Sequence, residues 1–472
     1  MTARLVAGVD SSTQSTKVEV RDLDSGQVVA HGSAAHPATT PPRSEQDPQA
    51  WWSAFERAWA AAGSPTVAAI SVGGQQHGMV VLDADRNVIR PAKLWNDTET
   101  AADAGWLVKQ LEGGAADWAA AVGSVPVAAF TVTKLSWLHR SEPDNWAKMA
   151  HVLLPHDWMT FRLTGELVTD RGDASGTGYW SPSSGQYRTD ILSIVDKDRD
   201  WSTVLPRVAD ATAVVGQWNG ALVACGTGDN MAAALGLGLQ QGEAVLSLGT
   251  SGTAYAISDH PTADASGAVA GFADASGRFL PLACTLNATK VTDAIARLLA
   301  VDHAEFDRLA LAAPAGAGGV TILPYFDGER TPNLPKSTGL VAGLRSDVSR
   351  EQLARAAVEG VVCGLLDALD ALGAQTPLRS VRLVGGGARG AAYRHVAAEL
   401  CDLPVSLADA DEAVATGACV QAAAIALGIS HHEVAERWGL GIAKPLDKTA
   451  GDTVGVRARY AELRSATYPS TA

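Results

Sequence analysis

The chain has 472 residues, of which 47% are hydrophobic and 19% are charged, and its formal net charge is −14. This composition excludes a disordered chain, and the length is too great for one core, so two large domains are expected. The acidic balance argues against a nucleic-acid surface, because phosphate backbones need an excess of Lys and Arg, but it does not exclude a single nucleotide site.

The cysteines and apolar runs favour a cytoplasmic protein. The five cysteines form no C-x-x-C pair and their number is odd, which favours buried thiols in a reducing compartment over disulfides or a cysteine metal site. The apolar run near the start is interrupted at Asp10, and no run elsewhere reaches the roughly 18 residues of a membrane span. We therefore expect no membrane partner.

The first predicted elements are a buried strand over residues 4–9, a polar turn over 10–17 and an alternating strand over 18–23. Asp10 lies where the first strand meets this turn, which is rich in hydroxyl groups. Such a loop can surround a phosphate group with N–H and O–H donors. An ordinary hairpin turn capped by Asp and Ser explains the same residues, so both interpretations stay open.

A second polar cluster follows the predicted strand over residues 66–72. Open α/β sheets bind ligands at the ends of such strands, and Gln75, Gln76 and His77 can form hydrogen bonds to hydroxyl groups. A lone histidine is more often a partly buried residue with a structural partner. The cluster alone therefore leaves the role of His77 open.

Two later segments also carry sugar-binding chemistry. Trp95 stands next to Asn96 and Asp97, which combines an aromatic face with polar groups, although three residues are a weak signal. The polar, Gly-rich loop over residues 169–178 either faces a substrate or is a plain surface loop.

The stretch over residues 225–253 contains two turns of small residues with a predicted helix between them, over 231–240. Asp229 lies in the first turn, near the start of that helix, where it is either a functional carboxylate or an ordinary N-cap. The second turn, over 249–252, follows a strand and offers N–H groups and hydroxyls. A carboxylate near a phosphate-binding loop suggests phosphoryl transfer to a hydroxyl group.

The second half of the chain repeats a pattern of the first. Residues 245–257 read as strand, polar turn and strand, as residues 6–20 do, which predicts two domains of similar topology. A strand over 381–384 leads into a Gly-rich turn over 385–390, which permits close approach of a ring or a phosphate. The chain lacks G-x-x-x-x-G-K-[ST], and this bears against a P-loop enzyme.

Capping residues locate the starts of several helices. Asp47, followed by proline, predicts one helix start, and Ser349 with Gln352 forms a capping box for a long helix. A last helix is predicted from near Asp411. Its small residues over 415–421 favour tight packing, which we expect to be against the nucleotide region.

Together these motifs resemble the FGGY carbohydrate kinases, in order and along nearly the whole chain. The segments that carry the resemblance are Asp10–Lys17, Ser44–Pro48, Gly74–Gly78, Leu94–Asp97, Gly228–Asn230, Leu246–Gly252, Gly328–Pro332 and Gly385–Arg389. Each is modest alone, but their order and spacing are specific.

The resemblance implies an α/β protein with the duplicated actin/hexokinase-like fold, a ribonuclease H-like core in each domain and an interdomain cleft. Residues 1–243 would form the sugar-binding domain and residues 244–472 the ATP-binding domain. The implied reaction uses ATP and Mg²⁺ to phosphorylate the terminal hydroxyl of a ketopentose, with D-xylulose as the expected substrate. Ribulose, gluconate, glycerol and other polyols stay open as alternatives.

The resemblance also assigns roles to residues. Asp229 would be the general base, and Asp10 would help to hold Mg²⁺, directly or through water, or the transferring phosphoryl group. The expected sugar side consists of Gln76, His77, Trp95, Asn96, Asp97 and Asn230. The expected ATP side consists of Ser12, Thr13, Gln14, Lys17, Gly249, Thr250, Asn287, Gly386, Gly387 and Ala388.

Two other classes of function stay open. An actin-like ATPase would hydrolyse ATP or polymerise without a sugar, but it leaves His77 and the Trp95 segment unexplained. A sugar-binding regulator without activity is disfavoured, because both Asp10 and Asp229 are present and no basic DNA-binding segment is attached. The expected partners are small molecules only, and a homodimer is left open.

Overall fold

The computed structural model describes residues 4–408, 412–448 and 453–469. Their contacts form two compact units. Unit 1 consists of Met1–Leu239, Asp259–Leu280 and Glu412–Gly441, and unit 2 consists of Gln240–Ser258, Pro281–Asp411 and Ile442–Ala472. Unit 1 therefore includes two segments from the second half of the chain.

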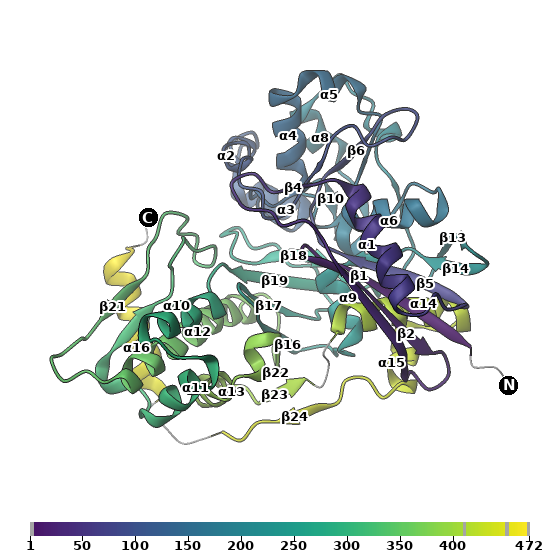
Figure 1. Cartoon of the computed structure of the whole chain (residues 1–472). Helices are drawn as coiled ribbons and strands as arrows, with labels where there is room; N and C mark the ends of the chain where they lie inside the picture. Colours follow the sequence, from purple (N-terminus) through teal and green to yellow (C-terminus); the bar gives the residue numbers. More distant parts are fainter. Residues whose placement is uncertain (1–3, 409–411, 449–452, 470–472) are drawn as a thin grey trace. The chain divides into compact units, whose positions relative to one another are not determined.

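Unit 1 is built on a sheet with the strand order β13-β14-β5-β1-β2-β3 (Figure 1). The central strand β1 (Leu5–Ser11) pairs antiparallel with β2 (Ser15–Asp22) and parallel with β5 (Ala69–Gly74). Asp10 consequently lies opposite Lys17 on one side and Gly73 on the other. The other strands are β3 (Val28–Ala35), β13 (Val214–Trp218), β14 (Ala221–Ala224) and β15 (Thr227–Gly228), which pairs with the end of β5.

The sheet of unit 2 repeats this topology in the run β24-β23-β22-β16-β17-β19. Its central strand β16 pairs antiparallel with β17 and parallel with β22, as β1 does with β2 and β5. The outer pairings also have the same directions in both units. The strands are β16 (Glu243–Leu248), β17 (Gly252–Ala256), β19 (Phe279–Thr285), β22 (Ser380–Val384), β23 (Val405–Ala408) and β24 (Ala443–Pro445). The predicted α/β duplication is confirmed.

Helices and short strands surround the two sheets. In unit 1 the helices are α1 (Pro48–Ala61), α2 (Ala101–Val108), α3 (Ala115–Val122), α4 (Thr131–Ser141), α5 (Pro143–Lys148), α6 (Pro155–Thr164), α7 (Arg171–Ala174), α8 (Thr189–Val195), α9 (Asp229–Gly236), α14 (Ala413–Leu427) and α15 (His431–Arg437). In unit 2 they are α10 (Thr289–Leu299), α11 (His303–Ala312), α12 (Arg350–Gly373), α13 (Ala391–Leu400) and α16 (Thr453–Thr467). The short strands are β4 (Glu45–Gln46), β6 (Val80–Leu82), β7 (Ala92–Lys93), β8 (His151–Leu153), β9 (Val168–Asp170), β10 (Trp180–Ser181), β11 (Gln186–Tyr187), β12 (Arg207–Ala209), β18 (Ala270–Ala273), β20 (Thr321–Leu323) and β21 (Leu340–Ala342).

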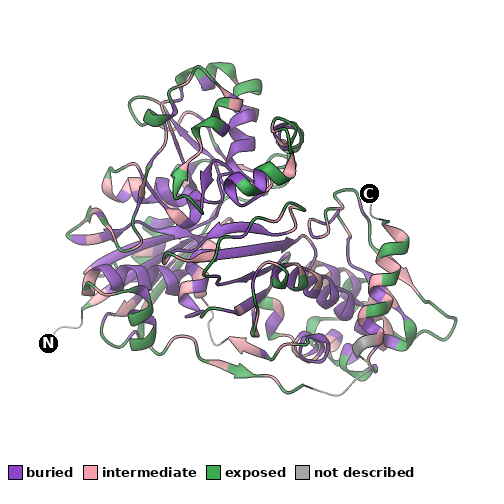
Figure 2. Cartoon of the chain, turned by 180° about the vertical axis from the view of Figure 1, so that it is seen from behind, coloured by how far each residue is buried: buried purple, intermediate pink, exposed green. Residues whose placement is uncertain are grey.

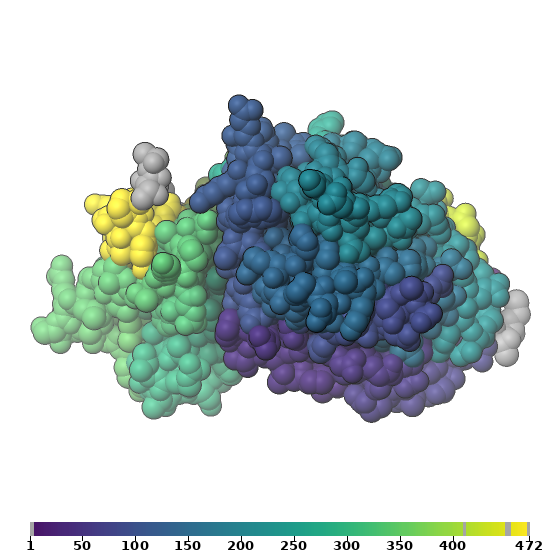
Figure 3. All heavy atoms as spheres, turned by 90° about the horizontal axis from the view of Figure 1, so that it is seen from above, coloured from purple at the N-terminus to yellow at the C-terminus, as the bar shows by residue number. Residues whose placement is uncertain are grey.

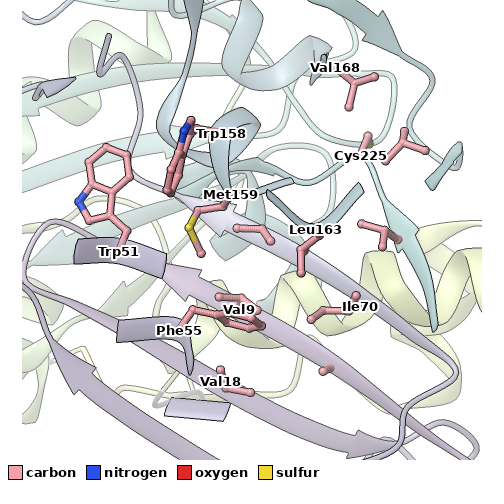
Figure 4. Packing of buried hydrophobic residues seen from close by; sticks show 14 of the residues in the cluster. Val9, Val18, Trp51, Phe55, Ile70, Trp158, Met159, Leu163, Val168 and Cys225 are labelled. Carbon is pink, nitrogen blue, oxygen red and sulfur yellow. The ribbon is translucent and has the colours of Figure 1, made fainter. Parts of the chain in front are cut away.

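The main core of unit 1 lies between the sheet and helices α1 and α6 (Figure 4). Trp51 of α1 meets Trp158 of α6 edge to face, with ring centroids 6.0 Å apart, and Phe55 packs below them. Helix α1 begins as predicted, because the Asp47 side chain accepts the N–H of Gln49. The central strands of both sheets are largely buried, whereas exposed residues lie on the edge strands, the loops and the outer helices (Figure 2).

Helix α14 covers the other side of this sheet. It packs against α9, β1, β5 and β2 of unit 1, and β2 carries Lys17 of the expected ATP side. The contact is close because small residues meet on both sides. A methyl group on Gly417 would overlap the carbonyl of Ala232, and one on Gly8 would overlap the carbonyl of Ala415. The predicted start of the helix near Asp411 lies outside the described residues.

Helices α2, α4, α5 and α8 pack against one another, outside the layer that α1 and α6 form on the sheet. Residues of this part of the chain, drawn in blue and teal, cover much of unit 1 in the view from above (Figure 3). Among the described residues no single helix is long and apolar enough to cross a membrane. The pair α14 and α15 passes this test only when the two are joined, and they are bent by 106° at the break.

Candidate active site

Asp10 lies near the carboxyl end of β1 and is only 3% exposed. The hydroxyl of Ser12 donates to its Oδ1 atom. Burial raises the pKa of Asp10 to about 6, against the lowering effects of the Ser12 bond and the charge of Lys17. Lys17 is itself held by Glu412, with Nζ 2.6 Å from Oε2. Asp10 is therefore ionised at neutral pH and faces a loop of hydroxyl groups.

Asp229 is the first residue of α9 and is half-buried. The N-cap is Gly228, so the alternative in which Asp229 caps the helix is wrong. Its Oδ1 atom accepts both the backbone N–H and the side-chain amide of Asn230, at 2.8 and 2.9 Å. Burial, followed by the negative charges of Asp10 and Asp173, raises its pKa to about 7. A carboxylate with this pKa can accept a proton at neutral pH.

Gln75 and Gln76 directly follow β5, and Gln76 contacts Asn230, the residue after Asp229. Gln76 accepts the side-chain amide of Asn230 on Oε1 at 2.8 Å, and the Oε1 atom of Gln75 accepts the hydroxyl of Thr13 at 3.2 Å. The Nε2 atoms of both glutamines are buried and have no hydrogen-bond partner among the described residues. Buried donors of this kind suit a ligand that carries several hydroxyl groups.

His77 adopts a left-handed backbone conformation with a φ of 65°. Its ring lies against Phe130 and Phe272, at centroid distances of 5.0 and 5.4 Å. The carbonyl of His77 accepts the hydroxyl of Thr131 at 3.1 Å. The surrounding packing therefore fixes both the ring and the backbone of this residue.

Trp95 lies next to the expected phosphate loop, whereas Asp97 is bonded to the backbone and stabilises the fold. The indole N–H of Trp95 donates to the hydroxyl of Thr13 at 2.8 Å, which joins the expected sugar and ATP sides within unit 1. The Oδ1 atom of Asn96 is buried and has no partner among the described residues. Asp97 is fully buried, and its carboxylate already accepts the N–H groups of Ser44 and Glu99.

Glu45, Asp97 and Glu99 bring three carboxylates together as metal ligands would. The ammonium of Lys93 stands among them, with Nζ at 3.1, 3.0 and 2.6 Å from their nearest oxygens. This ammonium supplies the positive charge that the carboxylates require, so the cluster does not offer a site for a metal ion.

In unit 2 the structure brings together the two segments expected to bind ATP. Gly249 and Thr250 lie between β16 and β17, and their carbonyls accept the N–H groups of Thr289 and Ala288 at 3.0 and 3.1 Å. Gly386, Gly387 and Ala388 form a short 3₁₀ turn after β22. A methyl group on Gly387 would collide with Leu248 and Thr289, so this glycine permits the close approach of the two segments.

Gln14 and Asn287, which were also expected on the ATP side, differ in their exposure to solvent. The side chain of Gln14 is exposed. Asn287 is 2% exposed, and its side-chain amide donates to the carbonyl of Gly328 at 2.7 Å and to Glu329 at 2.9 Å. Its polar atoms are thus used inside unit 2, where they hold the loop after β20.

The sequence did not reveal a cluster of buried charged side chains that packs against the segments of the expected sugar site. The loop over residues 169–178 is not a surface loop, because almost all of it is buried. Asp170 and Asp173 of this loop lie near His156 and Asp157 of α6. The one available signal was the density of aspartates in the loop, since His156 and Asp157 read as ordinary polar positions in a helix.

Comparisons with known proteins find matches over both halves of the chain. Residues 5–236 match the N-terminal domain of the FGGY family of carbohydrate kinases, and residues 244–426 match its C-terminal domain. The chain is 48% identical to a xylulose kinase of Streptomyces coelicolor over 461 residues, which cover 95% of this chain and 93% of the relative. It is 35% identical to a xylulose kinase of Haemophilus influenzae, with 88% and 89% covered.

Solved structures show the same fold. The crystal structure of xylulose kinase from Bifidobacterium adolescentis superimposes with a TM-score of 0.87 at 40% identity, over 98% of this chain and all of that one. A structure described as a xyloylose kinase, from Brucella ovis, gives a TM-score of 0.89 at 28% identity, over 99% of both chains. The expected actin/hexokinase-like fold is confirmed by these neighbours.

Proposed function

The chain belongs to the FGGY family of carbohydrate kinases, and from that premise we propose that it transfers the γ-phosphate of ATP to the terminal hydroxyl of D-xylulose. The products are D-xylulose 5-phosphate and ADP. The near-half identity with a xylulose kinase over almost the whole chain supports the choice of sugar. The observation that carries the chemistry is Asp229, a half-buried carboxylate with a pKa of about 7 beside unsatisfied amide donors.

In this proposal Asp229 takes the proton of the attacking hydroxyl. The bonds from Asn230 to Oδ1 hold the carboxylate in place, so that its other oxygen can receive the proton. Asn230 and Gln76, which are bonded to each other, and His77 bind the other hydroxyl groups of the sugar. Trp95 offers its ring to the apolar face of the sugar. Asn96 contributes its buried oxygen, and Asp97 acts indirectly by fixing the segment.

The phosphate side is proposed to begin at the loop after β1. The hydroxyls of Ser12 and Thr13 exchange their bonds to Asp10 and Gln75 for bonds to the phosphates, and Gln14 and Lys17 supply amide and ammonium donors. Asp10 fits Mg²⁺, because its carboxylate is ionised at neutral pH and offers the hard oxygen ligands that this ion prefers. When bound there, directly or through water, Mg²⁺ would neutralise the charge of the phosphates.

The nucleotide is proposed to bind to unit 2. Gly249 and Thr250 hold phosphate oxygens, and Gly386, Gly387 and Ala388 receive the adenosine. Asn287 acts indirectly, because its side chain is bonded to Gly328 and Glu329 while the next two residues, Ala288 and Thr289, donate to the carbonyls of Thr250 and Gly249. Sugar binding, the first phosphate loop and the catalytic base are thereby assigned to residues 1–243, and the rest of the ATP site to residues 244–472.

The test is a substrate panel. Purified protein with ATP and Mg²⁺ is given D-xylulose, D-ribulose, D-gluconate or glycerol, and kcat/KM is measured for each from ADP release. The proposal expects D-xylulose to give the highest value. ADP release at the same rate without any sugar would instead support an actin-like ATPase, and a higher value for another acceptor would reassign the substrate.

We also propose that the protein works in the cytoplasm with small molecules alone. The five cysteines are buried and free, which suits a reducing compartment. A homodimer is not assigned to any face, and light scattering of the purified protein would establish the oligomeric state.

A further inference from the structure

His156 is surrounded by three aspartates in the interior of unit 1. Its Nδ1 atom is 2.8 Å from Oδ2 of Asp173, and its Nε2 atom is 3.2 Å from Oδ1 of Asp157 and 3.7 Å from Oδ1 of Asp170. All four side chains are 3% exposed or less. Among the described residues, no lysine or arginine forms an ion pair with any of these carboxylates. The imidazole is therefore their source of positive charge.

The electrostatics of this cluster favour a charged imidazole. Burial disfavours the charge, but Asp157, Asp173 and Asp170 together outweigh burial and raise the pKa of His156 to about 9. Burial also raises the pKa of Asp157, to about 7. Losing the imidazolium would leave buried carboxylates without a counter-charge, which is costly in a low-dielectric interior.

The cluster touches both backbone segments that carry the sugar site. A methyl group on Gly74 would collide with the backbone and Cβ of His156, and one on Gly226 would collide with its ring. Gly74 directly precedes the Gln75–His77 segment, and Gly226 lies three positions before Asp229. The absence of side chains at these two glycines lets β5 and the turn before α9 lie directly against His156.

The same aspartates also interact with these segments. Asp170 accepts the hydroxyl of Thr227 at 2.7 Å, two positions before Asp229. The backbone N–H of His77 lies near the carboxylate of Asp173 and lowers the pKa of that carboxyl. His77 has the left-handed backbone conformation, which a residue other than glycine adopts where its surroundings hold it. The attraction between its N–H group and Asp173 provides part of that hold.

We propose that His156 is a positioning residue of the sugar site. Through Asp173 it holds the backbone of His77, and through Asp170 it holds Thr227, so that the hydroxyl-binding side chains keep a fixed position relative to Asp229. His156 touches neither sugar nor ATP in this proposal, which rests on the proposed kinase function. Within the part of the chain that the structure describes, the contacts given for His156 are with Asp157, Asp170 and Asp173 and with the backbone at Gly74 and Gly226, and none of these residues belongs to the loops assigned to the nucleotide.

The test compares KM values for the two substrates. The variant His156→Gln removes the charge and keeps a polar side chain. Because small misplacements of reacting groups cost up to about a hundredfold, we expect kcat/KM for D-xylulose to fall roughly 10- to 100-fold. KM for ATP should stay within about twofold of the wild-type value. A general destabilisation of the protein would instead change the KM values for both substrates.

The matched control is His431→Gln. His431 is also buried, at 3% exposed, but it lies in α15 and makes none of the contacts described for His156. This variant should keep the wild-type KM for D-xylulose.

A second pair of variants covers the case in which His156→Gln does not fold. Thr227→Val keeps the shape of the side chain and removes its bond to Asp170, and Asp173→Asn removes the negative charge that lies near the backbone N–H of His77. Both should raise KM for D-xylulose and not KM for ATP. If His156→Gln folds, the double variant with Asp173→Asn should lose no more than the worse single variant, because both changes break one unit.

The outcomes separate this inference from the proposed function. A folded His156→Gln or Thr227→Val protein with wild-type KM for D-xylulose overturns the positioning role alone, as does an equal rise in both KM values. Wild-type protein that releases no ADP in response to any sugar overturns the proposed function and, with it, this inference.

Discussion

Replacing Asp229 with asparagine should remove the proton acceptor and leave the surrounding structure intact. The amide oxygen of asparagine can still accept the two hydrogen bonds that Asn230 donates to Oδ1. The new side chain has no ionisable group, and loss of a general base typically lowers kcat by about 10²- to 10⁴-fold. We expect the Asp229→Asn protein to show this loss while its thermal midpoint stays close to that of the wild type.

In the wild-type protein the reaction rate should depend on pH, because only the ionised form of Asp229 can accept the proton. With a pKa of about 7, roughly half of Asp229 is ionised at pH 7 and about one-tenth at pH 6. Because Asp10 raises this pKa, the two carboxylates titrate as a coupled pair, and the kinetic midpoint belongs to the pair. The rate should therefore rise about tenfold per pH unit below a midpoint near 7 and level off above it.

The assay is kcat/KM for D-xylulose at saturating ATP, from about pH 5.5 to about pH 8.5, with ADP release as the signal. Asp103→Asn is the control, because Asp103 is also buried but pairs with Ser136 and Arg140 outside the proposed site. Normal turnover of Asp229→Asn would refute the base assignment. A wild-type rate that does not fall toward acid pH would refute the role of its raised pKa.

Three further predictions concern stability and positioning. Gly417→Ala should destabilise the protein by about 1–3 kcal/mol in urea unfolding, because its methyl group meets the carbonyl of Ala232, whereas Gly105→Ala, with open space around it, should not. Trp95→Phe loses one hydrogen bond of about 0.5–1.5 kcal/mol, so kcat/KM should fall roughly 2- to 12-fold, and an unchanged value would remove that bond from the site. The pKa of His156 is higher in the folded state than its ordinary 6.5, so its stabilisation is complete below about pH 6.5 and is lost as pH rises through about 9. The melting temperature should accordingly fall between about pH 6.5 and pH 9, and this fall should be smaller in His156→Gln.

Local sequence patterns were sufficient for the repeated sheet. The strand, turn and strand at residues 6–20 and 245–257 became β1–β2 and β16–β17, because each pair is encoded by alternation and by turn residues within a few positions. The capping box of Ser349 and Gln352 likewise formed as predicted, since it depends on neighbours three residues apart. The family resemblance rested on such short segments.

Long-range packing could not be predicted in the same way. Helix α14 joins unit 1 because Gly8 and Gly417 allow close backbone contact, and no local pattern says which partner a small-residue helix will meet. The polar, Gly-rich sequence of the loop over residues 169–178 is compatible with a substrate-facing loop and with a plain surface loop. The burial of this loop depends on His156, which supplies the compensating charge from a separate helix.

The most direct test of the kinase function is the rate of ADP release by wild-type protein with ATP and Mg²⁺, measured with and without D-xylulose. The account predicts that D-xylulose greatly accelerates the release, and that each ADP is matched by one D-xylulose phosphorylated at its terminal hydroxyl. An ADP rate that is the same with and without D-xylulose would contradict it.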